Sequence, residues 1–213
     1  MALKISLPFF LLSLLVLTLV RAEHPVVRRR SRARAFIELQ CRTTLYPDLC
    51  VRCLSYYVSN FTTTLSHQQL AQIALKVSLE RAESTQAYVT EVAMELKQRK
   101  AKDYRAVKEC LDQINDGVDQ LTNCIKETRM IKENGTTSNF PWHASNVQTW
   151  MSTALTDASM CMDGFSSRAI EGKKKAIIKA KVLNLEQATS NALALFNRFA
   201  ARYRSSHVNK PKV

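Results

Sequence analysis

Long stretches of the chain repeat apolar residues every three or four positions and contain few residues that break helices. The pattern begins in FIELQCRTTLYPDLCVRCLSYYV (36–58), where Pro47 interrupts it and predicts two short helices folded back on each other. Four longer amphipathic segments follow, and they begin near Ser66, Tyr104, Ser145 and Lys173. We therefore expect an all-α fold, an antiparallel four-helix bundle with an N-terminal helical hairpin.

Local signals indicate where these helices begin and end. Ser66 stands three residues before a glutamine, a spacing typical of a capping box. A polar break at 97–103 predicts the turn into the second long helix, and KENGTTSNFPWH (132–143) is the longest loop signal. Ser145 is expected to cap the third helix, and residues 205–213 are expected to fray as a C-terminal tail.

The N-terminal segment is typical of a secretory signal peptide. Residues 1–22 combine a lysine near the start, an apolar run and a small residue for cleavage, and the run is short for a bilayer span. Residues 23–35 are basic without an apolar pattern and are interpreted as a mobile arm. The remaining 36–204 are expected to form one domain, with the hairpin at 36–60 and the bundle at 66–204. We expect a secreted protein without a membrane segment in its mature form.

Secretion affects how the six cysteines and the possible modification sites are interpreted. An oxidising route favours disulfides over free thiols or metal sites. The cysteines are too scattered for a zinc ribbon and histidines are few, so we expect no metal and no cofactor. Asn60 and Asn134 each begin a glycosylation sequon beside an expected loop. No phosphate-binding loop, nucleophile elbow or metalloprotease motif occurs, and the chain is not expected to be an enzyme.

One acidic stripe stands out in a chain of formal charge +13. In CLDQINDGVDQL (110–121), Asp112, Asp116 and Asp119 fall at i, i+4 and i+7, so a helix would place them on one side. Spacing alone leaves two interpretations open. The acids either solubilise an exposed helix face or bind a partner.

Four motifs, in order and with matching spacing, resemble one known family. They are the segments CRTTLYPDLC (41–50), CLDQINDGVDQL (110–121), VQTWMSTALTDASMCMDGF (147–165) and SNALA (190–194). Together with the signal peptide, they resemble the plant invertase and pectin methylesterase inhibitors over roughly 36–200. The resemblance implies a secreted four-helix bundle with an N-terminal hairpin, in the apoplast or cell wall.

The resemblance also implies a disulfide pattern. The family pairs its four characteristic cysteines first with second and third with fourth, which here gives Cys41–Cys50 and Cys110–Cys161. The second bridge would close a loop of about 50 residues and stabilise the fold by roughly 3–4 kcal/mol. Cys53 and Cys124 lie outside this set. We interpret them as free thiols, with a third bridge between them as the alternative.

Within the family, the chain looks more like the pectin methylesterase branch. Invertase inhibitors typically carry a Pro-Lys-Phe motif, and the corresponding stretch here is Asn-Phe-Pro-Trp-His (139–143). The resemblance implies a one-to-one complex in which the bundle covers the enzyme's substrate cleft. Its acidic contacts would correspond to Asp112, Asp116, Asp119 and Asp163. The chain departs from the pattern at Met160, where a Thr contact is usual. Because the sequence ends at residue 213 without a catalytic domain, we expect a free-standing inhibitor.

Two other functions stay open. The protein could inhibit acid invertase, which the missing Pro-Lys-Phe disfavours, or it could be a wall protein that binds polyanions without inhibiting an enzyme. Two basic clusters, Arg28–Arg34 and Lys173–Lys181, would hold acidic pectin in that case, or they are simply solvated faces. Secretion argues against nucleic acid as their partner.

Overall fold

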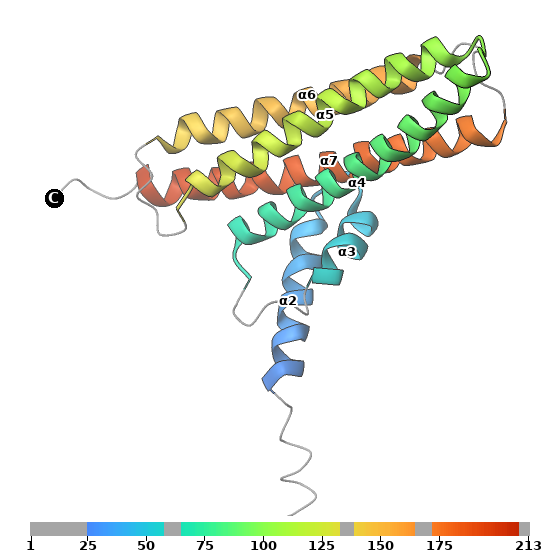
Figure 1. The fold of residues 1–213 in the computed structure, drawn as a ribbon. Coiled ribbons are helices and arrows are strands. Elements are labelled where there is room, and N and C mark those ends of the chain that lie inside the picture. The colour runs from blue at the N-terminus through green and yellow to red at the C-terminus, as the bar shows by residue number, and fades with distance from the viewer. Residues whose placement is uncertain (1–24, 58–64, 133–138, 165–171, 209–213) are drawn as a thin grey trace, which may run out of the picture.

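The computed structural model describes residues 25–57, 65–132, 139–164 and 172–208, and nearly all of these residues are helical. The helices are α2 (Pro25–Cys41), α3 (Pro47–Ser55), α4 (His67–Gln98), α5 (Tyr104–Met130), α6 (Phe140–Gly164) and α7 (Lys173–Val208). Figure 1 shows their arrangement. No strand occurs within the described ranges.

The four long helices form the antiparallel bundle that the sequence predicted. α5 packs along α6 and α4 along α7, and further contacts between α4 and α5 and between α6 and α7 close the bundle. The short helices α2 and α3 form a hairpin against α4 and α7, and the first turns of α2 point away from the bundle (Figure 1). The expected fold class is confirmed.

Helix α4 begins at the capping box that the sequence indicated. The Ser66 hydroxyl accepts a hydrogen bond from the amide of Gln69 at 3.1 Å, and the Gln69 side chain accepts one from the amide of Ser66 at 3.0 Å. These two bonds satisfy amides that have no partner within the helix.

The apolar core consists of two clusters along the bundle. In one of them an aromatic group joins α6 to the end of α7, where the ring of Phe140 stacks on that of Tyr203 with centroids 3.6 Å apart. The other cluster lies toward the α4–α5 turn and contains the buried Ile114 and Ile178. Each large apolar side chain that is fully buried contributes roughly 1.5–3 kcal/mol.

Side chains of α7 hold the hairpin in place through hydrogen bonds to the backbone of the hairpin. The side chain of Asn191 donates to the carbonyl of Tyr46 at 2.9 Å and accepts from its amide at 3.0 Å. Arg198 donates to the carbonyl of Gln40 at 2.9 Å. Because these backbone groups lie at the bend between α2 and α3, the bonds fix the orientation of the hairpin on the bundle.

Both disulfides implied by the resemblance are present. Cys41–Cys50 closes the hairpin, and Cys110–Cys161 joins α5 to α6 across a sequence separation of 51 residues. Cys53 and Cys124 are free, so the alternative of a third bridge is not realised. Burial raises the pKa of the Cys124 thiol to about 12.

Two expectations about the ends of the chain need correction. The basic segment 23–35 was expected to be a mobile arm, but α2 already begins at Pro25. Arginine and alanine favour helix, and Ala33 and Ile37 anchor the second half of α2 by burial, so the helix extends back from that anchor. The C-terminal tail was expected to fray from residue 205, but α7 continues to Val208.

The start of α6 also differs from the prediction. Ser145 was expected to cap this helix, but α6 begins at Phe140, within the segment interpreted as loop. Pro141 is compatible with the first turn, where its missing amide costs no hydrogen bond. Phe140 is buried in the core, which stabilises the additional turn.

Several sequence predictions lie outside the described residues. They include the signal peptide at 1–22 and both sequons, at Asn60 and Asn134. Within the described part of the chain, no helix is both long and apolar enough to cross a bilayer.

The turn between α4 and α5 places a lysine where glycine is usual. The amide of Ala101 donates to the carbonyl of Leu96 at 3.0 Å, and the amide of Lys100 donates to the carbonyl of Lys97 at 3.1 Å. This is the Schellman pattern, whose residue after the C-cap has left-handed backbone angles. Lys100 has φ 50°, a conformation that costs a residue with a side chain roughly 1–2 kcal/mol.

We expect Lys100→Gly to stabilise the protein. The free energy of unfolding should rise by about 1 kcal/mol, because glycine adopts left-handed angles without this cost. Thermal unfolding should show a Tm increase of about 2–4 °C. The matched control is Lys97→Gly, which lies inside the helix and should destabilise by about 1 kcal/mol. If both substitutions changed the free energy of unfolding in the same direction, this account of the turn would be contradicted.

Candidate functional site

The acidic stripe lies on the solvent-facing side of α5. Asp112, Asp116 and Asp119 are all exposed, as the spacing predicted. The opposite side of the helix is buried in the core, and its buried residues are Val107, Cys110, Ile114, Gly117, Leu121, Cys124 and Thr128. The three carboxylates therefore project from a helix whose position is fixed by packing.

The three carboxylates differ in their surroundings. Asp112 accepts a hydrogen bond from Lys108 at 2.6 Å, and this contact raises the pKa of the Lys108 ammonium group. Both side chains are about half exposed, so the pair is one that solvent screens. Within the described residues, no ion pair involves Asp116 or Asp119. Asp116 instead lies near a second carboxylate, Asp157 of α6.

Helices α5 and α6 are held together along their whole shared length. At one end the Cys110–Cys161 disulfide places the two Cα atoms 4.2 Å apart. In the middle the helices approach at Gly117, where a Cβ atom would lie 3.9 Å from a backbone oxygen of Ala154. Nearer the other end, the carboxylate of Glu127 contacts Nδ1 of His143 at 2.8 Å. The stripe and the adjoining face of α6 thus form one rigid surface.

The outer side of α6 carries a row of hydroxyl groups. Ser145, Thr149, Ser152 and Thr156 follow helical spacing and line one shallow depression. The hydroxyls of Ser152 and Thr156 donate to carbonyls one turn earlier in α6, at 2.8 and 3.1 Å, which leaves their oxygens as acceptors toward solvent. The row consists of serine and threonine and is electrically neutral, and α6 contains no lysine or arginine. We call the stripe and the row together the α5–α6 face.

Asp163 is exposed but does not lie level with the stripe. Asp163 lies two residues after Cys161, and Asp112 lies two residues after Cys110, its disulfide partner. Because α5 and α6 are antiparallel, the two aspartates lie on opposite sides of this disulfide along the bundle. At 1.5 Å per residue, their levels along the bundle differ by about 6 Å. Asp163 therefore lies toward the start of α5, and the four acids do not form one compact cluster.

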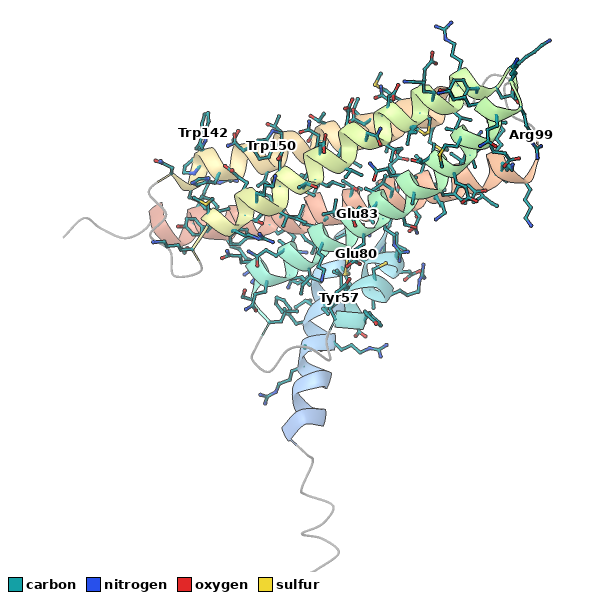
Figure 2. All side chains as sticks on the ribbon, in the orientation of Figure 1. Tyr57, Glu80, Glu83, Arg99, Trp142 and Trp150 are labelled. Atoms are coloured by element: carbon teal, nitrogen blue, oxygen red, sulfur yellow. A yellow bond between two sulfur atoms is a disulfide. The ribbon has the colours of Figure 1, made fainter. Side chains whose placement is uncertain are left out.

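Two further side chains of α6 mark the edges of this face. Met160, which occupies the position where the resemblance implies a threonine, is 53% exposed. Trp142 is 68% exposed near the start of α6, and Figure 2 shows it at the end of the bundle opposite to Arg99. Trp150 is partly buried against the core. Large exposed apolar side chains beside polar rows are common in protein-binding surfaces.

The described residues contain no group of three or more histidine, cysteine, aspartate or glutamate side chains that could hold a metal ion. The α5–α6 face presents carboxylates, hydroxyls and the exposed ring of Trp142 to solvent.

The family described as plant invertase/pectin methylesterase inhibitor matches residues 35–195. The chain belongs to this family. It is 42% identical to pectinesterase inhibitor 9 of Arabidopsis thaliana over 193 residues, which cover 91% of this chain and 94% of the relative. It is 39% identical to pectinesterase inhibitor 11 of the same plant, with 93% and 96% covered, and 37% identical to a 21 kDa protein of Daucus carota, with 81% and 87% covered.

Among solved structures, this member of the inhibitor family is similar to a crystal structure of a mutant form of a pectin methylesterase inhibitor from Arabidopsis. The TM-score is 0.55 at 17% identity, and the match covers 74% of this chain and 92% of the other. At this identity the likeness concerns the fold alone. The family assignment made from the four motifs is confirmed.

Among the described residues of this inhibitor, Asp157 is a buried carboxyl group that the sequence did not predict. Asp157 is only 8% exposed, and one of its carboxylate oxygens has no hydrogen-bond partner among the described residues. Burial raises its pKa above the ordinary 3.8, and the charge of Asp116 raises it further. The sequence gives little indication of this burial, because an aspartate among serines and threonines in a helix is typical of a solvent-exposed position.

We expect Asp157→Asn to stabilise the protein at neutral pH. Below pH 3.8 the carboxyl is protonated in both states, and above it the folded state resists ionisation while the unfolded state does not. The aspartate therefore costs stability as pH rises, and its neutral analogue should gain on the order of 1 kcal/mol at pH 7. Thermal unfolding at about pH 3 and pH 7 measures this difference.

The control for this substitution is Asp119→Asn, at an exposed position of the same surface. It should change the free energy of unfolding by less than about 0.5 kcal/mol. A gain at Asp157→Asn that is equally large at acidic pH would contradict the burial argument.

Proposed function

We propose that this protein is secreted to the plant cell wall, where it binds pectin methylesterase one-to-one and blocks the enzyme's substrate cleft. Membership of the inhibitor family supports the proposal, as do the relatives named pectinesterase inhibitors. The observation that carries the site assignment is the α5–α6 face, a rigid surface with Asp112, Asp116 and Asp119 on α5 and a neutral hydroxyl row on α6.

The mechanism follows from the chemistry of that face. An enzyme that acts on pectin must accept a chain that becomes polyanionic as its methyl esters are removed, so its cleft should tolerate carboxylates. The stripe would meet such a cleft with its charges, and the hydroxyl row would exchange hydrogen bonds with its walls. Inhibition is then steric occlusion without covalent chemistry. Because charged contacts contribute, binding should weaken with added salt.

Inhibition of acid invertase is the second candidate, because the family includes both classes of inhibitor. The absence of Pro-Lys-Phe disfavours it. The corresponding stretch contains Phe140, whose side chain is buried in the core and is therefore not available to a partner. Titration of the purified protein into both enzyme assays separates the candidates. No inhibition of pectin methylesterase at micromolar protein would contradict the leading proposal.

We expect the triple substitution of Asp112, Asp116 and Asp119 to Asn to weaken inhibition of pectin methylesterase by roughly 10- to 100-fold. The helical circular dichroism signal should stay unchanged, because all three side chains are exposed. Inhibition constants at low and moderate salt provide the measurement, and the salt dependence should decrease along with the affinity.

The matched control removes three exposed carboxylates elsewhere, by Asp48→Asn, Glu83→Gln and Glu91→Gln on α3 and α4. It changes the net charge by the same amount, and Figure 2 shows Glu83 on α4, away from the α5–α6 face. Equal losses in the two triple variants would show that net charge, not this face, determines binding.

A further inference from the structure

The end of the bundle where α4 turns into α5 gathers lysine and arginine from two distant parts of the chain. The start of α7 lies beside this turn, where Lys174 forms an ion pair with Glu95 of α4 across 79 residues of sequence. Figure 2 labels Arg99 at this end. The cationic end, as we call it, consists of Lys97, Arg99, Lys100, Lys102, Arg105, Lys108, Lys173, Lys174 and Lys175. Among the described residues they outnumber the carboxylates at this end, which are Glu91, Glu95, Asp103, Glu109, Asp112 and Asp163.

Part of the positive charge is neutralised within the protein. Glu95 pairs with Lys174 and, at 2.9 Å, with Arg99. The hydrogen bond from Lys174 and the charge of Arg99 lower the pKa of the Glu95 carboxyl. Arg105 and Lys108 each pair with a carboxylate one turn later in α5.

Four other lysines of the cationic end have no carboxylate partner among the described residues. Lys97, Lys100, Lys102 and Lys173 are exposed, and in the part of the chain that the structure describes no ion pair involves them. All four carry a compact ammonium charge on a flexible stem, which can follow an anionic partner without fixed geometry. They are the exposed lysines of this end whose charge no described carboxylate offsets.

The positions of these cations conflict with local preferences. Lys100 occupies the left-handed position of the turn, where glycine would avoid strain. Lys173, Lys174 and Lys175 begin α7, although the N-terminus of a helix already carries partial positive charge. The first turn of α7 has no acidic residue to offset this charge. Violations of local rules that share one surface are expected where that surface has a function.

We propose that the cationic end binds a linear polymer of acidic sugars, such as de-esterified pectin. The inference rests on the proposed function, which places the protein beside an enzyme that produces such a polymer. A polyanion supplies many weak charge contacts at once, which these four exposed lysines can accept. Binding there would hold the inhibitor near the product of the enzyme that it restrains.

This surface is separate from most of the α5–α6 face. Asp116 and Asp119 lie 12 and 15 residues beyond Tyr104 along α5, which corresponds to about 18 and 22 Å. A polymer on the cationic end therefore leaves the middle of the stripe open. The two surfaces could bind polymer and enzyme at the same time.

The test measures binding of polygalacturonate and of highly methyl-esterified pectin of similar length by affinity electrophoresis, without enzyme. The test variant combines Lys97→Gln, Lys100→Asn and Lys102→Gln, since asparagine tolerates the left-handed position. Wild-type protein should bind polygalacturonate and bind the esterified polymer much more weakly. The variant should bind polygalacturonate roughly tenfold or more weakly at low salt.

The control removes three exposed cations at the opposite end, by Lys126→Gln, Arg129→Gln and Arg204→Gln. It should retain most of the binding, and all proteins should keep the same circular dichroism spectrum. Equal losses in the control would overturn the proposal, as would wild-type protein that fails to bind polygalacturonate. Binding to a DNA duplex of equal charge that exceeds binding to polygalacturonate would also overturn it.

Enzyme inhibition is measured separately on the same variants. If the test variant inhibits pectin methylesterase normally but no longer binds polygalacturonate, the result supports the polymer site. If it keeps the polymer but loses inhibition, the cationic end contacts the enzyme instead, and the proposal is wrong. The absence of inhibition by wild-type protein would refute the proposed function while the polymer measurement still stands by itself.

Discussion

The close packing of α5 against α6 is the constraint on which the rest of the structure depends. A disulfide at one end, a glycine contact in the middle and the Glu127–His143 contact toward the other end prevent the two helices from sliding past each other. Because their relative position is fixed, the side of each helix that faces solvent is fixed too. The proposed binding face therefore requires no rearrangement of its backbone before it meets a partner, which lowers the entropic cost of association.

The strongly basic composition conceals an uneven distribution of charge. Helix α6 has no lysine or arginine, and the middle of α5 presents carboxylates, whereas the start of α7 and the α4–α5 turn are basic. A molecule with such a distribution can orient in the field of a charged partner before contact. The net charge alone would have suggested one uniform polyanion-binding surface.

Much of the fold could be predicted from the sequence, because helix periodicity and capping are local signals. The capping box at Ser66 and the break at 97–103 are examples. Both disulfides came from the family resemblance. The early start of α6 could not be predicted from the sequence, because it depends on the burial of Phe140 against α7. The burial of Asp157 depends on how closely Gly117 lets the helices approach, and no local pattern encodes that distance.

The attachment of the hairpin to α7 has a consequence for biosynthesis. Asn191 and Arg198 bond to backbone groups that lie 145 and 158 residues earlier in the chain. At ordinary rates of translation, roughly 10–30 s separate the synthesis of these partners. During that interval the Cys41–Cys50 disulfide can close locally, but the apolar side of the hairpin has no α7 to cover it. The hairpin can therefore be crosslinked before it packs on α7, which is the last helix to be synthesised.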